Sequence, residues 1–81
     1  MKLLTALDTI KQRPEMYFGP QPRVDDLFTF LLGWDMAVDT NVCSSIINHI
    51  AMIKKTGSKV PDSNDIGFQE AINTIIEYLE S

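Results

Sequence analysis

The stretch VDDLFTFLLGWDMAVD, residues 24–39, decides how this chain folds. Its apolar residues recur every three or four positions, which predicts an amphipathic helix rather than a strand. One apolar stripe consists of Leu27, Leu31, Trp34 and Val38. A second apolar row, on another face, consists of Phe28, Leu32 and Met36. A helix that is apolar on two faces either lies at the centre of a fold or exposes one face to a partner. Gly33, inside this helix, is typical of a place where another backbone comes close.

A first, shorter helix precedes this stretch. Leu3, Leu7 and Ile10 repeat at helical spacing. This helix should end before Pro14, because a residue that precedes proline avoids the α region. The following sequence RPEMYFGPQP, residues 13–22, is too rich in proline and glycine for a long helix or a central strand, so it predicts a rigid turn.

The turn carries three large apolar side chains. Met16, Tyr17 and Phe18 are expected to pack over the helix that begins near Val24. The alternative is that Tyr17 or Phe18 contacts a partner protein, because aromatic residues at a surface turn often contribute strongly to binding.

Two further helices follow residues 24–39. VCSSIINHIAMIKK, residues 42–55, predicts one of them, with Asn41 as a possible cap and Gly57 as its stop. FQEAINTIIEYLE, residues 68–80, predicts the last, after a linker rich in turn residues. The inward positions of these two helices are Cys43, Ile46, Ile47, Ile50 and Ile53, and Phe68, Ile72, Ile75, Ile76 and Leu79. We therefore expect an all-α single domain of four helices over residues 1–81.

The charge balance of the chain is acidic, with a formal net charge of −4 and an isoelectric point of about 4.6. Nucleic-acid binding requires clustered Lys and Arg at the phosphates, so we expect no nucleic-acid partner. The one basic cluster, KKTGSK at residues 54–59, is typical of a helix C-terminus, where lysines complement the helix dipole. Acidity favours a basic partner, and a basic protein is one such partner.

The sequence contains no evident catalytic set or metal site. Cys43 is the only cysteine and His49 the only histidine, so zinc has too few ligands and no nucleophile is paired with a base. We expect no enzyme activity and no cofactor. The N-terminus shows no signal-peptide pattern and no segment is apolar enough to span a bilayer, so we expect a cytoplasmic protein with no membrane partner.

The segment LDTIKQRPEMYFG, residues 7–19, resembles the N-terminal signature of the ATPase domain of gyrase B and topoisomerase IV. The matching positions are Leu7, Arg13, Pro14, Met16, Tyr17 and Gly19. Leu31 and Met36 stand where that family has its catalytic glutamate and its magnesium-binding asparagine, so the resemblance implies no ATP hydrolysis. A gyrase-related or nucleotide-binding module without ATPase activity is the alternative function.

The same turn followed by an acidic helix also resembles small bacterial immunity proteins that are encoded beside toxins, including those of contact-dependent growth inhibition. This resemblance implies a protein that binds and neutralises a cognate toxin. Nuclease toxins are commonly basic, and an acidic inhibitor gains association rate and specificity by complementing that charge. The expected partner is therefore a basic nuclease domain.

The expected partner surface lies on the helix at residues 24–39. Asp35 and Asp39 are one turn apart and lie beside the row that contains Leu32 and Met36, so the row would form an apolar strip edged by carboxylates. The alternative is that this row is simply core. The complete set of expected partner-binding residues is Asp35, Asp39, Asp62, Asp65, Tyr17 and Phe18.

Overall fold

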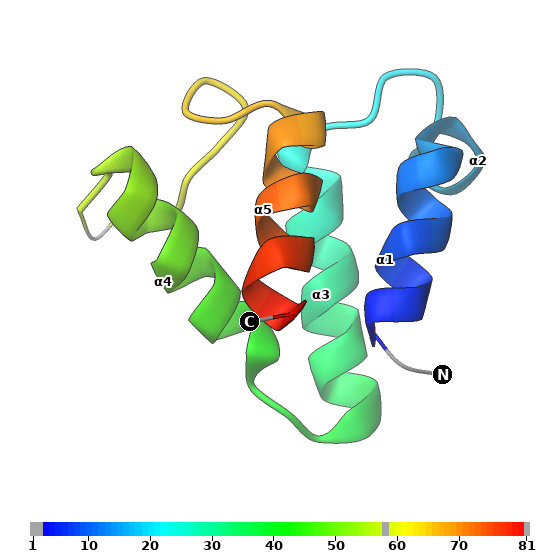
Figure 1. Ribbon diagram of the computed structural model, residues 1–81, viewed down its shortest axis with the longest axis horizontal. Coiled ribbons are helices and arrows are strands. Elements are labelled where there is room, and N and C mark those ends of the chain that lie inside the picture. Colours follow the sequence, from blue (N-terminus) through cyan, green and yellow to red (C-terminus); the bar gives the residue numbers. More distant parts are fainter. Residues whose placement is uncertain (1–2, 58, 81) are drawn as a thin grey trace.

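The computed structural model describes residues 3–57 and 59–80, which form five helices (Figure 1). They are α1 (Leu3–Gln12), α2 (Pro14–Phe18), α3 (Val24–Val38), α4 (Val42–Lys54) and α5 (Phe68–Glu80). These described residues contain no strand, so the expectation of an all-α chain is confirmed. All four expected helices are present, and α2 is an additional short helix.

The segment expected to be only a turn contains α2, which is five residues long. Pro14 occupies its first position, where proline is favourable because its fixed φ suits a helix and its missing N–H has no intrahelical partner. Gly19 ends the helix with φ of 87°, and its N–H donates to the carbonyl of Glu15 over 3.1 Å. A left-handed backbone of this kind suits glycine because no Cβ is present to clash.

Of the three large apolar side chains of α2, only Phe18 packs against the core, so the expected packing over α3 is confirmed in part. Met16 is 69% exposed, and Tyr17 is also exposed. Phe18 is half-buried and lies edge-on against Phe68 of α5, with ring centroids 5.8 Å apart. An aromatic pair in this geometry adds about 1 kcal/mol beyond the burial of its area. The aromatic part of the turn therefore fastens α2 to α5.

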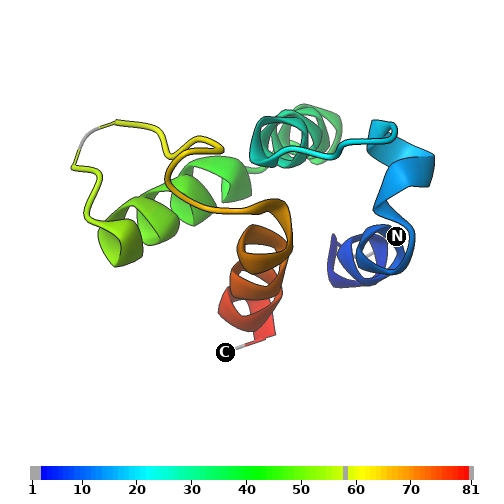
Figure 2. The same cartoon turned by 90° about the horizontal axis from the view of Figure 1, so that it is seen from above.

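The helix that joins the others is α5. It packs against α1, α3 and α4, whereas α3 packs against α4 and α5 (Figure 1). Seen from above, α5 lies between α1 and α4, with α3 across the opposite side of the molecule (Figure 2). Leu32 and Met36 are exposed, so α3 leaves one of its two apolar faces uncovered.

A single cluster of buried apolar side chains lies between the long helices. Its largest fully buried members come from the four long helices: Leu7, Val24, Leu27, Leu31, Ile46, Ile50, Ile72 and Ile75. Pro61 of the linker is buried to the same extent. Burial of each such side chain stabilises the fold by about 2 kcal/mol. Most of the expected inward positions are thus confirmed. Val38 and Ile53, each in the last turn of its helix, are exposed instead.

Residues with a left-handed backbone end α3 and α4. Asp39 follows α3 with φ of 56°, and Lys55 follows α4 with φ of 57°. The expected stop at Gly57 lies two residues later and is also left-handed. The expected cap at Asn41 occupies the correct position, but its side chain makes no capping hydrogen bond.

The linker between α4 and α5 is fixed at several points. Pro61 and Ile66 are buried in the core, and the guanidinium of Arg23 donates to the hydroxyl of Ser63 over 2.9 Å. Lys54 at the end of α4 forms a 2.6 Å ion pair with Glu70 at the start of α5. Because Arg23 immediately precedes α3, the linker lies against the N-terminal end of that helix.

Gly33 lies on the uncovered face of α3, and a Cβ at this position would meet no atom within 4 Å. The expected close approach of another backbone is therefore wrong. We predict that Gly33→Ala stabilises the protein by about 1 kcal/mol, because alanine loses less backbone entropy than glycine in a helix. Thermal unfolding should show a midpoint about 5 °C higher.

Gly19→Ala is the matched control for this substitution. Its added Cβ also meets nothing within 4 Å, but the backbone at Gly19 is left-handed, so the same change should destabilise the protein. A fall in the unfolding midpoint of Gly33→Ala would contradict the assignment of this position to an open helix face.

Candidate functional site

The uncovered face of α3 carries exposed apolar side chains between carboxylates. Phe28 is buried, whereas Leu32 is 55% and Met36 is 79% exposed, so the second apolar row belongs to the core only at its first member. Asp25 and Asp39 are exposed near the two ends of the same face, and α3 contains no Lys or Arg. We call Asp25, Leu32, Met36 and Asp39 the α3 strip.

Asp35 does not belong to the α3 strip, because its side chain is only 8% exposed. One carboxylate oxygen accepts hydrogen bonds from the hydroxyl of Thr40 at 2.6 Å and from the N–H of Val42 at 2.9 Å. The other accepts from the N–H of Cys43 at 2.7 Å. Asp35 therefore caps the N-terminus of α4 from within α3, and the expectation of a solvent-facing Asp35 is wrong.

The surroundings of Asp35 also determine its ionisation. Burial of the carboxylate opposes its charge, but the hydrogen bonds from Thr40, Cys43 and Val42 together outweigh this effect and lower the pKa of Asp35. Burial and the nearby charge of Asp35 raise the pKa of Cys43, whose thiol donates to the carbonyl of Phe28 at 3.7 Å. The thiol is thus a buried packing group, as the sequence predicts.

Asp62 and Asp65, expected to extend the acidic surface, are instead engaged within the linker. Lys59 forms ion pairs with Asp65 at 3.2 Å and with Asp62 at 3.6 Å. The N–H of Asp62 donates to Asp65, and the N–H of Asn64 donates to Asp62. The bond from Asp62 and the pairing with Lys59 lower the pKa of Asp65, and Asp65 in turn raises the pKa of Lys59.

The linker carboxylates are also remote from Asp39. The bond between Ser63 and Arg23 holds the linker at the start of α3, whereas Asp39 follows its end. A helix of 15 residues is about 22 Å long, so the two acidic groups lie at opposite ends of α3.

Tyr17 and Phe18 lie at a third place. They line an apolar pocket of about 270 Å³ together with Ala6, Thr9 and Ile10 of α1 and Phe30 of α3. No charged side chain lines this pocket. The six expected partner-binding residues are therefore divided among the pocket, the linker, the buried cap and the α3 strip, and only Asp39 lies beside the exposed apolar row.

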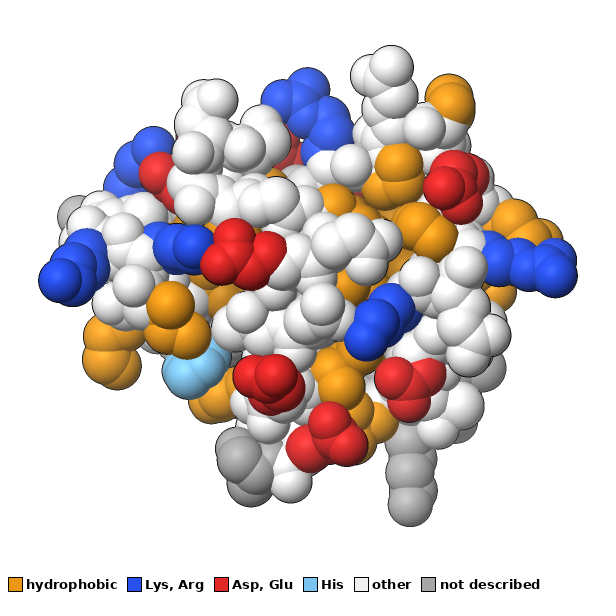
Figure 3. Space-filling view, turned by 45° about the horizontal axis from the view of Figure 1, so that its top comes forward, with side chains coloured by type: hydrophobic (Ala, Val, Ile, Leu, Met, Phe, Trp, Pro, Cys, Tyr) orange, Lys and Arg blue, Asp and Glu red, His pale blue; other side chains and the backbone are white. Residues whose placement is uncertain are grey.

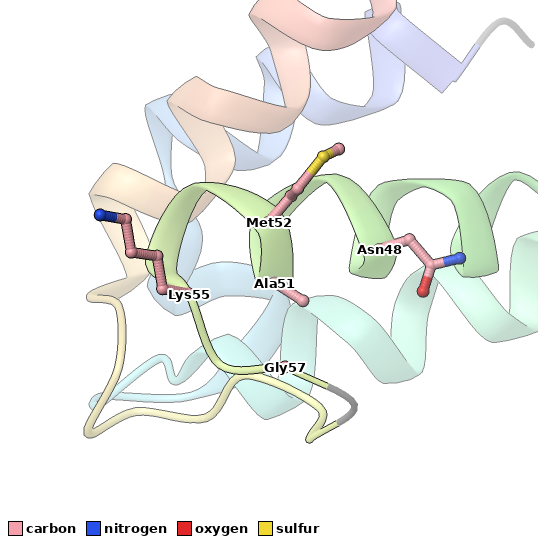
Figure 4. Close-up of a pocket in the computed structure, with 5 residues that line it drawn as sticks. All are labelled: Asn48, Ala51, Met52, Lys55 and Gly57. Atoms are coloured by element: carbon pink, nitrogen blue, oxygen red, sulfur yellow. The ribbon is translucent and has the colours of Figure 1, made fainter.

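A shallow depression on α4 was not expected from the sequence (Figure 4). It is lined by Asn48, Ala51, Met52, Lys55 and Gly57. Met52 is 74% exposed and projects from the opposite side of α4 to Ala51 in this view. The only signal for it in the sequence is that Met52 departs from the apolar stripe of Cys43, Ile46 and Ile50.

The remaining polar groups form no catalytic constellation among the residues that the structure describes. His49 is half-buried, and its ring lies 4.5 Å from that of Tyr78. Within the described ranges, no group of three or more His, Cys, Asp and Glu side chains is placed to hold a metal ion. On the face shown in Figure 3, the Lys and Arg side chains stand as separate groups among the acidic ones. None of the described helices combines the length and apolar character needed to cross a membrane.

Comparison of the chain with protein-family models, with curated proteins and with solved structures found no match.

We predict that Asp35→Asn destabilises the fold at pH 7, because the amide lacks the charge that the two N–H groups of α4 stabilise. A carboxylate whose pKa is lowered by folding contributes fully above its unfolded-state value of about 3.9. The contribution is lost as the pH falls through the lower pKa of the folded state. The difference in urea midpoint between the variant and the wild type should therefore shrink below about pH 4.

Asp39→Asn is the control, since Asn tolerates the left-handed backbone and the Asp39 side chain makes no ion pair among the described residues. It should change the midpoint much less at every pH. An equal loss for Asp35→Asn at pH 3 and pH 7 would show that the carboxylate charge does not stabilise the start of α4.

Proposed function

We propose that this chain is a cytoplasmic immunity protein that binds and neutralises a cognate toxin, with a basic nuclease domain as the partner. The observation that carries the proposal is the α3 strip. Two large apolar side chains, Leu32 and Met36, lie uncovered between Asp25 and Asp39 on a helix without any Lys or Arg.

The α3 strip combines two contributions to binding. Covering Leu32 and Met36 removes apolar area from water, which stabilises a complex by about 25 cal/mol per Å² before the costs of association are subtracted. The carboxylates at its ends complement a partner whose surface is rich in Lys and Arg. Complementary charge of this kind raises the association rate and disfavours acidic competitors.

The overall charge supports the same class of partner. A net charge of −4 on 81 residues attracts a basic domain over a Debye length of about 8 Å at physiological ionic strength. In a complex with a nuclease, the carboxylates of the α3 strip would lie at the basic cleft of the nuclease, in the positions that attract phosphate. Asp25 and Asp39 are exposed and can make such contacts, whereas Asp35 accepts hydrogen bonds from the start of α4.

The gyrase-related alternative has less support from the geometry. A nucleotide requires cations or clustered N–H groups for its phosphates, and the apolar pocket at Tyr17 and Phe18 has no charged side chain in its lining. The residues that resemble the ATPase signature instead lie in α1, in α2 and at Gly19, which ends α2.

The proposal is tested by co-expressing this chain with the product of the adjacent open reading frame. The two proteins should co-purify, and the chain should protect cells from the growth arrest that the neighbouring product causes alone. If the neighbouring product is not toxic, or if it is toxic and this chain neither binds it nor protects against it, the proposed function is wrong.

We predict that Asp39→Asn weakens the complex about fivefold at low salt, equivalent to about 1 kcal/mol, and reduces the salt dependence of binding. Glu77→Gln, an equal charge change at an exposed position on α5, should leave the affinity within twofold. Isothermal titration calorimetry at two salt concentrations measures both variants. Equal losses for the two would mean that Asp39 acts only through the net charge.

A further inference from the structure

Two shallow depressions follow one another along α4. Ser44 lines the first, together with Leu32 and Met36 of α3. Asn48, one helical turn after Ser44, lines the second, together with Met52 and Lys55 (Figure 4). Residues four positions apart are neighbours on a helix surface, so Ser44 and Asn48 place the two depressions next to each other on one surface of α4. We call this surface, from Met36 and Asp39 through Ser44 and Asn48 to Met52 and Lys55, the α4 groove.

The α4 groove has opposite charges at its two ends. Asp39 lies at its start and Lys55 at its end, and neither takes part in an ion pair with the described residues, whereas Lys54 and Lys59 are both paired. Met36 lines the same depression as Asp39, and Met52 lines the same depression as Lys55. The two methionines are 79% and 74% exposed. Methionine is flexible and polarisable, and it is frequent on surfaces that adapt to a partner.

The backbone around the α4 groove restricts what can bind there. The groove lies on α3 and α4, whose backbone groups are hydrogen-bonded within each helix, and the described residues offer no strand edge. An extended segment would therefore find few main-chain partners in the groove, whereas a helix satisfies its own N–H and C=O groups. The 13 residues of α4 span about 20 Å, which matches a partner helix of about 13 residues.

We propose that a helix of the partner protein lies along the α4 groove, with a cationic side chain at Asp39, an anionic side chain at Lys55 and apolar side chains over the two methionines. This inference rests on the proposed function, because it assumes the protein partner. It adds the mode of binding: the interface continues from the α3 strip along the whole of α4, and the partner contributes a helix of mixed charge.

The test uses the purified product of the adjacent open reading frame and the complete chain described here. Met52→Ser and Lys55→Glu should each weaken the complex at least fivefold. Both side chains are exposed, so circular dichroism should stay unchanged. The unfolding midpoint should fall slightly for Lys55→Glu only, because Lys55 ends α4, where a cation complements the helix dipole. Met16→Ser is the matched control, because Met16 is similarly exposed but lies on α2, and it should bind like the wild type.

The possible outcomes separate this inference from the proposed function. Wild-type affinity in both Met52→Ser and Lys55→Glu, with weaker binding in Asp39→Asn, would overturn the α4 groove and leave the α3 strip as the interface. An equal loss in Met16→Ser would also overturn it, because the effect would not be specific to α4. If the wild-type chain forms no complex at all, both the proposed function and this inference fail.

Discussion

The carboxylate of Asp35 is the interaction on which the arrangement of α3 and α4 depends. It accepts hydrogen bonds from Thr40, Val42 and Cys43, so one side chain from the last turns of α3 satisfies the first N–H groups of α4. Those donors would otherwise be left without intrahelical partners next to the buried Cys43. The short connection between the two helices is thereby fixed in one conformation, and with it the direction in which α4 leaves α3.

The connection between α3 and α4 that Asp35 fixes also determines the position of both candidate binding surfaces, the α3 strip and the α4 groove. Because Asp35 turns inward, its neighbours Leu32 and Met36 on the same helix lie toward solvent, with Asp39 at the end of the row. Ser44, near the start of α4, lines the same depression as Leu32 and Met36, so the exposed surface of α3 extends onto α4. The position of one buried charge thus determines which apolar side chains remain uncovered.

The sequence predicted the long helices because their apolar residues recur at helical spacing and because proline and glycine mark their limits. It did not predict α2, since proline is unfavourable inside a helix but favourable at its first position, and the pattern alone does not distinguish these cases. It also did not identify α5 as the helix that contacts all the other long helices. Periodicity defines the apolar face of each helix but not which helix that face meets.

The candidate site could be predicted only in part. The row of Leu32 and Met36 follows from the spacing in α3, and Asp39 follows from its place one turn after Asp35. Two aspartates at this spacing suggest one shared acidic face, however, and the structure separates them into a buried cap and an exposed group. That separation arises from the packing of α4, which no local pattern in α3 encodes.

The burial of Cys43 beneath the same cap has a chemical consequence for the whole chain. Its only thiol is buried and has a raised pKa, so little thiolate is available for disulfide exchange or oxidation while the start of α4 keeps its native structure.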